Sequence, residues 1–214
     1  MIKAVIFDLD GVIVDTAHYH FIAWKRLAKE LGIHFTEQEN EQLKGVSRMR
    51  SLEIILELGN LLLSQEEMEK LATKKNQWFV DYINAMKPDE IFPNVKEMIQ
   101  NIRANGIKVA LASSSKNADT VLTLLDIKNL FDVIVDGTMI RNTKPDPEIF
   151  LLAARKLNLP PSECLVFEDA EAGVEAAVAA GMKCIGVGSP QQLSKADVVV
   201  SKTADFDIQK IKNL

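Results

Sequence analysis

Cysteine is scarce, with only two residues among the 214 of the chain. Cys164 and Cys184 each lie in an apolar, strand-like run without a nearby histidine, so we expect buried thiols in a reducing compartment rather than a disulfide framework or a zinc site. The N-terminal apolar run ends at Asp8 and Asp10, too early for a signal peptide. No run reaches the roughly 18–20 apolar residues of a membrane span. We therefore expect a cytoplasmic protein without membrane contact.

Positive charge is also limited, since 25 Lys and Arg stand against 30 Asp and Glu, for a net charge of −5. Without a long Lys/Arg run, the chain is a poor generic nucleic-acid binder, although a local basic pocket is not excluded. The apolar share of 47% is that of an ordinary globular chain, which excludes the disordered, collagen-like and disulfide-scaffold classes. The length corresponds to between one and two domains, enough to bury a core without disulfides.

Six short apolar runs, rich in Val and Ile, alternate with helix-length segments. Because the runs are apolar throughout rather than at every second residue, they predict a parallel sheet covered by helices on both faces. The alternation is typical of a doubly wound, Rossmann-like α/β fold. The predicted strands are residues 2–7, 107–112, 132–135, 164–167, 183–187 and 197–200, and the predicted helices are residues 94–105, 117–125, 147–157 and 171–180.

Residues 16–88 interrupt this alternation with some 70 residues that contain no convincing strand. Thr36-x-x-Glu39 and Ser64-x-x-Glu67 are typical of capping boxes that open helices. We therefore predict a helical cap over residues 16–88, inserted after the first strand of an α/β core that comprises residues 1–15 and 89–214.

Polar residues follow four of the predicted strands. Because the carboxyl ends of parallel strands meet at one edge of a sheet, where helix N-termini also point, we expect these residues to form one site. They are Asp8 and Asp10 after the first strand, residues 113–117 after the second, Lys144 in the loop after the third, and Glu168 and Asp169 after the fourth.

Asp8 and Asp10 are two residues apart on extended chain, so both carboxylates can face one pocket. With Glu168 and Asp169 they make an all-oxygen environment that favours Mg²⁺. Asp8 could then act as a nucleophile towards a phosphoryl group and Asp10 as a general acid and base. A calcium loop is excluded because the Asp-x-Asp-x-Asp-Gly spacing is absent. A single Asp-x-Asp-Gly is most often a strand-ending turn, but the polar residues at the other strand ends favour a site.

The ordered set of motifs resembles the haloacid dehalogenase superfamily of phosphoryl-transfer enzymes. The matching residues are Asp8-Leu9-Asp10-Gly11-Val12, Ser113, Lys144-Pro145, and Glu168-Asp169 followed by Gly173. The resemblance implies that Asp8 forms an aspartyl phosphate, that Asp10 donates and accepts the proton, and that Ser113 and Lys144 stabilise the transferring group. It also implies that Mg²⁺ is held by Asp8, the Asp10 main-chain carbonyl and Asp169, with Glu168 as a further ligand.

Within that superfamily, the chain resembles the β-phosphoglucomutase family, in residues 15–24, 43–48 and 75–76 at the insert and in residues 110–117 of the core. The resemblance implies interconversion of β-D-glucose 1-phosphate and glucose 6-phosphate through β-glucose 1,6-bisphosphate. The cap Arg48 would bind the non-reacting phosphate, and His20 would couple cap closure to proton handling at Asp10. The other implied substrate-binding residues are Trp24, Gly45, Val46, Lys75, Ser115, Lys116 and Asn117.

Simpler interpretations exist for several of these residues. Trp24 could be a core aromatic of the cap, and Arg48 a charge at a helix start. For Lys75, the sequence alone favours a solvated side chain beside Lys74. Val14 replaces a threonine that is common in related mutases, and residues 136–143 differ from the usual loop before the lysine.

Three functions remain in competition at this level. The leading one is the isomerase, acting as a monomer on hexose phosphates. A phosphatase of small sugar phosphates would share the core machinery and differ only in the cap. A silent ligand-binding scaffold is disfavoured because the full set of catalytic residue types is present.

Overall fold

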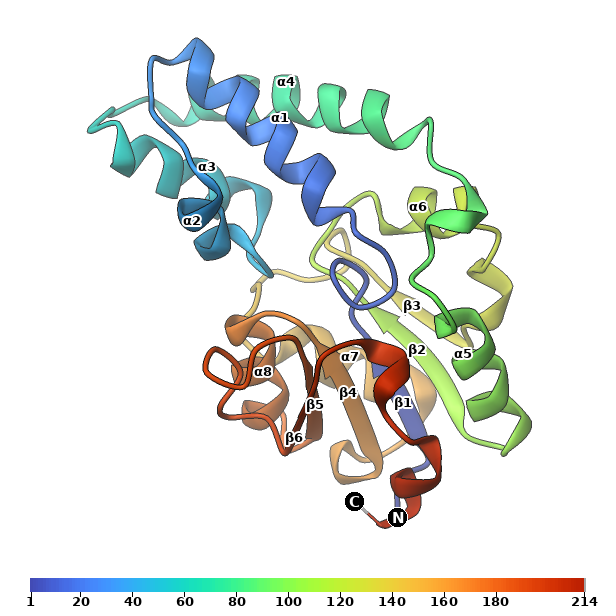
Figure 1. The fold of residues 1–214 in the computed structure, drawn as a ribbon. Helices are drawn as coiled ribbons and strands as arrows, with labels where there is room; N and C mark the ends of the chain where they lie inside the picture. The colour runs from blue at the N-terminus through green and yellow to red at the C-terminus, as the bar shows by residue number, and fades with distance from the viewer. Residues whose placement is uncertain (214) are drawn as a thin grey trace.

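The structure is a computed structural model that describes residues 1–213. Its centre is a parallel sheet of six strands in the order β3-β2-β1-β4-β5-β6 (Figure 1). The strands are β1 (Ala4–Phe7), β2 (Lys108–Ala112), β3 (Val133–Val135), β4 (Cys164–Glu168), β5 (Lys183–Val187) and β6 (Val198–Val200). All six predicted strands are confirmed, with bounds that differ by no more than two residues.

Helices cover both faces of the sheet, as predicted (Figure 1). Val5 and Phe7 of β1 belong to one buried cluster, and Ala4 and Ile6 to another. The first cluster includes residues of α5 (Val95–Ala104) and α6 (Ala118–Leu124), and the second includes residues of α7 (Glu148–Leu157) and α8 (Glu171–Ala179). Successive strand residues point to opposite faces, so two covered faces explain why the strands are apolar throughout.

The cap helices follow β1 and lie together above the carboxyl ends of the strands (Figure 1). They are α1 (Ala17–Glu30), α2 (Glu37–Asn40), α3 (Arg48–Leu58) and α4 (Gln65–Ile83). Both predicted capping boxes are present, with Thr36 and Ser64 accepting hydrogen bonds from the backbone of Glu39 and Glu67. A separate apolar cluster, which includes Leu27 and Ile55, fills the space between these helices.

Short 3-10 helices occur in the connections and at the end of the described chain. They are η1 (Glu41–Leu43), η2 (Pro88–Glu90), η3 (Lys128–Leu130), η4 (Pro161–Glu163), η5 (Thr203–Asp205) and η6 (Ile208–Asn213). Cys164 and Cys184 are both free and buried, as expected from the sequence. No helix within residues 1–213 combines the length and apolar character needed to cross a membrane.

Candidate active site

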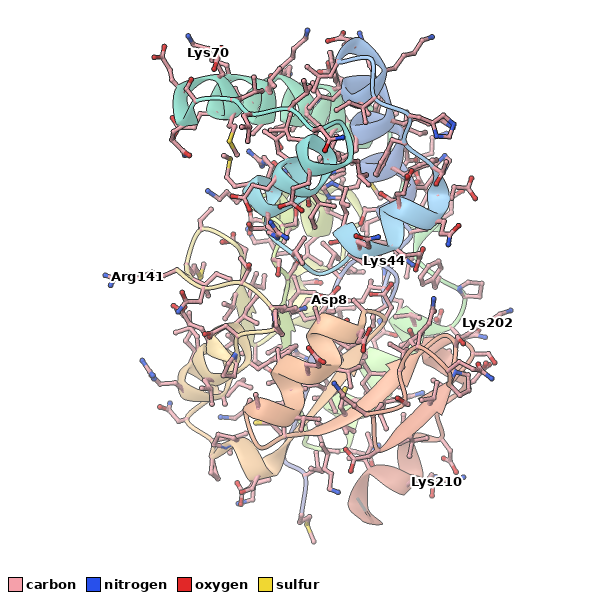
Figure 2. The ribbon with its side chains drawn as sticks, turned by 90° about the vertical axis from the view of Figure 1, so that its left-hand side faces the viewer. Asp8, Lys44, Lys70, Arg141, Lys202 and Lys210 are labelled. Atoms are coloured by element: carbon pink, nitrogen blue, oxygen red, sulfur yellow. The ribbon has the colours of Figure 1, made fainter. Side chains whose placement is uncertain are left out.

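The sheet register brings the predicted strand-end residues together. Phe7 at the end of β1 pairs with Leu111 of β2 and Phe167 of β4. The residues that follow these three positions therefore leave the sheet at one edge, beneath the cap. Asp8 lies there, between the sheet and the cap segment that carries Lys44 (Figure 2).

Lys144 is the buried cation of this edge. Its Nζ donates hydrogen bonds to Asp8 Oδ1 and Glu168 Oε1, each at 2.5 Å, and to the carbonyl of Ala112 at 3.4 Å. The other carboxylate oxygen of Glu168 accepts a hydrogen bond from the backbone N–H of Ala170 at 2.8 Å. Burial lowers the pKa of Lys144, but the attraction of Asp8 and Glu168 outweighs burial and raises it above the ordinary value. Lys144 therefore carries a positive charge between two buried carboxylates.

The carboxylates outnumber the positive charge beside them. Oxygen atoms of Asp8, Glu168 and Asp169 all lie within 4.8 Å of one another. Burial raises the pKa of Asp8 to about 8 and that of Asp10 to about 6, although Lys144 lowers both. Burial and the charge of Glu168 raise the pKa of Asp169 well above its usual range. A buried, all-oxygen donor set with excess negative charge fits a hard divalent cation.

Two glycines allow these acids to pack closely. Gly11 has φ +78°, and a methyl group there would collide with the carboxylate of Asp169. A methyl group at Gly173 in α8 would collide with the carboxylate of Glu168. Both positions therefore exclude a side chain for a steric reason, in addition to the strain that φ > 0 imposes at Gly11.

A cavity of about 110 Å³ lies between the cap and the core, and most of the predicted site residues line it. Ser113, Lys144 and Glu168 are buried and do not line the cavity; Lys144 and Glu168 connect to it through Asp8. The Ser113 hydroxyl accepts a hydrogen bond from the backbone of Ser115 at 3.1 Å. The predicted residues that line the cavity are His20, Trp24, Gly45, Val46, Arg48 and Lys75 from the cap, and Asp8, Asp10, Ser115, Lys116, Asn117 and Asp169 from the core.

Lys75 corrects one interpretation made from the sequence. The prediction of a solvated side chain at this position is wrong, because Lys75 is only 1% exposed. Its Nζ lies 2.7 Å from His20 Nδ1 and 4.4 Å from the centre of the Trp24 ring. Burial lowers the pKa of both His20 and Lys75 well below their ordinary values, and Arg48 acts in the same direction. Trp24 combines both roles considered for it, since it belongs to the apolar cluster of the cap and also lines the cavity.

Some cavity residues had no individual role predicted from the sequence. Lys44 lies within residues 43–48, which carry the family resemblance, and Ser114 lies within residues 113–117, which were expected at the strand-end site. Ser114 Oγ donates a hydrogen bond to the Gly45 carbonyl of the cap at 3.0 Å. The further unpredicted lining residues are Ala17, Asn40, Leu43, Ser47, Ser51, Gly137 and Thr143. Ala17, Leu43 and Ser47 lie in segments that carry the family resemblance, and Gly137 and Thr143 lie in the loop before Lys144. Their place at the cavity was not predicted, because it depends on how the cap sits on the core.

Known proteins resemble the chain over nearly its whole length. Residues 2–181 match the family described as haloacid dehalogenase-like hydrolase. The "Beta-phosphoglucomutase" of Bacillus subtilis (strain 168) is 44% identical over 97% of this chain and 92% of that protein. The "Phosphorylated carbohydrates phosphatase" of Thermotoga maritima is 37% identical over 86% of this chain and 83% of that protein. A crystal structure of β-phosphoglucomutase from Clostridium difficile, 44% identical, superposes with a TM-score of 0.96 and covers 100% of this chain and 96% of that one.

Proposed function

The chain belongs to the haloacid dehalogenase-like hydrolase family, and on that premise we propose that it isomerises β-D-glucose 1-phosphate and glucose 6-phosphate. The observation that carries the proposal is the lining of one cavity by the nucleophile candidate Asp8 and by two cations, Arg48 and Lys116. A substrate with one phosphate at Asp8 needs positive charge to bind its second phosphate. The cavity offers the carboxylate of Asp8 for the first and the cations for the second. The 44% identical relative bears the name of this activity.

Asp8 is the proposed acceptor and donor of the phosphoryl group. A phosphorylated Asp8 transfers its group to the sugar monophosphate, which gives β-glucose 1,6-bisphosphate and a free carboxylate. The bisphosphate then turns within the cavity, and Asp8 takes the other phosphoryl group. Lys144, held 2.5 Å from Asp8, offsets negative charge as the group transfers. Ser113 is proposed to stabilise the transferring phosphoryl group together with Lys144.

Asp10 is the proposed general acid and base. It lines the cavity two residues after Asp8. In the first transfer, it removes the proton from the attacking sugar hydroxyl. In the second transfer, it returns a proton to the sugar oxygen that is released when Asp8 takes the phosphoryl group. His20, in contact with Lys75 across the cavity wall, is proposed to link cap position to this proton transfer.

The carboxylate cluster fits a divalent metal ion, which enzymes of this family need, and we propose Mg²⁺. Asp8, the main-chain carbonyl of Asp10 and Asp169 are the proposed ligands. Both carboxylate oxygens of Glu168 already have partners, Lys144 and the Ala170 backbone. Each of these oxygens keeps a second lone pair, so Glu168 is proposed as a further ligand. When bound, the ion supplies positive charge that offsets carboxylate repulsion and attracts phosphate oxygens.

The second phosphate is the proposed ligand of Arg48 from the cap and of the core loop. The core contribution comes from Ser115, Lys116 and Asn117, of which Lys116 is exposed at the cavity mouth. Gly45 and Val46 are proposed to line the sugar, with Trp24 as a wall and Lys75 as a further polar contact. Because these contacts come from both parts of the chain, they form fully only when the cap meets the core, which also keeps water from the aspartyl phosphate.

We also propose a monomer in a reducing, cytoplasmic setting. The two buried free thiols support the reducing compartment. The net charge of −5 is unfavourable for nucleic acid.

One assay separates the isomerase from the phosphatase suggested by the Thermotoga relative. Purified protein receives Mg²⁺, β-glucose 1-phosphate and a trace of the bisphosphate, and glucose 6-phosphate and free phosphate are measured together. The isomerase makes glucose 6-phosphate faster than phosphate, and Asp8→Asn makes neither product. Faster release of phosphate would replace the proposal by a phosphatase. The exposed Asp81→Asn is the matched control and retains both rates.

A further inference from the structure

Two hydrogen bonds join the core to the cap at the cavity. Ser114 Oγ donates to the Gly45 carbonyl at 3.0 Å, and Asn117 Nδ2 donates to Asn76 Oδ1 at 2.9 Å. Asn117 belongs to the proposed phosphate-binding loop, so a bound phosphate competes for its amide. Ser114 has no proposed contact with the substrate, so its bond to the cap can persist through the reaction.

On the cap side, the bond is made to Gly45, a residue without a side chain. Gly45 has φ +73°, and a Cβ atom there would lie 3.3 Å from the Ala170 Cβ and 3.9 Å from the Lys144 Cδ. At Gly45 the cap loop, residues 44–48, thus approaches the core through its backbone alone. Apolar contact alone gives this approach little direction, whereas a hydrogen bond to the Gly45 carbonyl fixes distance and orientation.

On the core side, packing and a hydrogen bond hold the backbone around Ser114 in place. A methyl group at Gly137 would collide with the Ser114 carbonyl, so the loop after β3 packs directly against this backbone. The next residue, Ser115, donates its backbone N–H to the hydroxyl of Ser113, which is fully buried. The Ser114 hydroxyl is therefore presented to the cap from a well-supported backbone.

We propose that Ser114 is a positioning residue that sets the cap loop on the core. By holding Gly45, it places the neighbouring Val46 and Arg48 for the sugar and its second phosphate, and so it contributes to substrate affinity without touching the reacting atoms. The substrate part of this inference rests on the proposed function; the placement of the cap loop does not.

The test measures cap opening by thiol labelling, independently of any substrate. Ser51 of α3 is 4% exposed and lines the cavity, and both native cysteines are buried. In a Ser51→Cys background, the rate of reaction with a thiol reagent reports the population in which the cavity is open. Ser114→Ala is compared with Ser114→Thr, which keeps the hydroxyl. The matched control is Ser189→Ala, which removes a hydroxyl bonded to Gln191 on a distant loop.

Loss of one such hydrogen bond is expected to raise the labelling rate about threefold to tenfold in Ser114→Ala. Without the Ser51→Cys change, Ser114→Ala raises KM for β-glucose 1-phosphate by a similar factor with kcat within about twofold, as for lost uniform binding. Ser114→Thr and Ser189→Ala stay near the parent rates. An unchanged labelling rate in Ser114→Ala overturns the proposal, and so does a fall in kcat at constant KM. If the parent protein lacks isomerase activity, the proposed function fails while the labelling result still decides the role of Ser114.

Discussion

Lys75 shows how far neighbouring residues can differ in environment. Lys74 is exposed and pairs with Glu30 at 2.6 Å, whereas Lys75 is buried beside His20. Consecutive residues of a helix point about 100° apart, so one of two adjacent lysines can face solvent and the other a cavity. The face of α4 that is buried depends on its packing against α1, which the periodicity of α4 alone does not determine.

Replacing Lys75 with Met is expected to stabilise the fold while it weakens the substrate site. Burial lowers the pKa of Lys75 well below the 10.5 of a free lysine. At pH values below 10.5, the Lys75 amine binds its proton more readily in the unfolded chain than in the folded chain. Lys75 therefore destabilises the folded protein at neutral pH. Lys75→Met should raise the free energy of unfolding by about 0.5–2 kcal/mol at pH 7 in urea titrations, and should lower kcat/KM.

The pH dependence of that gain provides its check. As pH rises towards the unfolded pKa, the unfolded chain loses its advantage in proton binding, so the gap between Lys75→Met and the parent should shrink from pH 7 to pH 10. Lys74→Met, which removes only an exposed ion pair, should change stability by less than about 1 kcal/mol without this trend. A gap for Lys75→Met that grows with pH would contradict the explanation.

At the scale of helices and strands, the sequence predicts most of the core. The strands were predictable because burial on both faces leaves apolar residues at every position, as in residues 164–167. The helix starts of α2 and α4 were predictable because Thr36 and Ser64 carry local capping signals. The division at residues 16 and 88 remains a prediction. The contact of Ser114 with the cap loop was not predictable, because it forms only where the cap loop meets the core.

The capping box of α4 is expected to contribute to stability. Ser64 Oγ accepts the Glu67 N–H, and the Glu67 carboxylate accepts the Ser64 N–H at 2.8 Å. Ser64→Ala removes the cap and should lower the free energy of unfolding by about 0.5–2 kcal/mol in urea titrations. The matched control is Ser201→Ala, at an exposed position that does not precede an α-helix. Its free energy of unfolding should stay within about 0.5 kcal/mol of that of the parent. Equal effects of the two changes would mean that the box contributes nothing specific.

For the whole molecule, the net charge of −5 gives a poor picture of the site. Acidic residues gather at the carboxyl ends of the strands, and the basic residues Arg48, Lys75 and Lys116 line the cavity above them. One sheet edge thus offers a cation site next to a pocket suited to anions.

Binding of Mg²⁺ should stabilise the folded chain through this cluster. At a concentration one hundred times the dissociation constant, a ligand specific for the folded state adds about 2.7 kcal/mol to the free energy of unfolding. The rise in Tm on addition of Mg²⁺ should disappear in Asp169→Asn. Without metal, Asp169→Asn should be more stable than the parent, because it relieves repulsion with Glu168 and Asp8.

Asp197→Asn is the matched control for the metal experiment. Asp197 pairs with Lys183 at 2.6 Å, away from the cluster. Its change should leave the Mg²⁺-dependent rise in Tm intact. An equal Mg²⁺-dependent rise in Tm in Asp169→Asn and in the parent would mean that the metal binds outside this cluster.

The central claim is that the core performs the chemistry while the cap selects a substrate with a second phosphate. Its most direct test is the effect of Arg48→Ala on two substrates, β-glucose 1-phosphate and acetyl phosphate, with Arg50→Ala as control. Arg50 lies in the same helix but is exposed, with Glu53 and Glu57 as partners at 3.0 and 2.9 Å. Arg48→Ala should lower kcat/KM for the sugar phosphate at least about thirtyfold. Hydrolysis of acetyl phosphate should stay within about twofold of the parent, and Arg50→Ala should change neither rate. Equal losses on both substrates in Arg48→Ala would contradict the account.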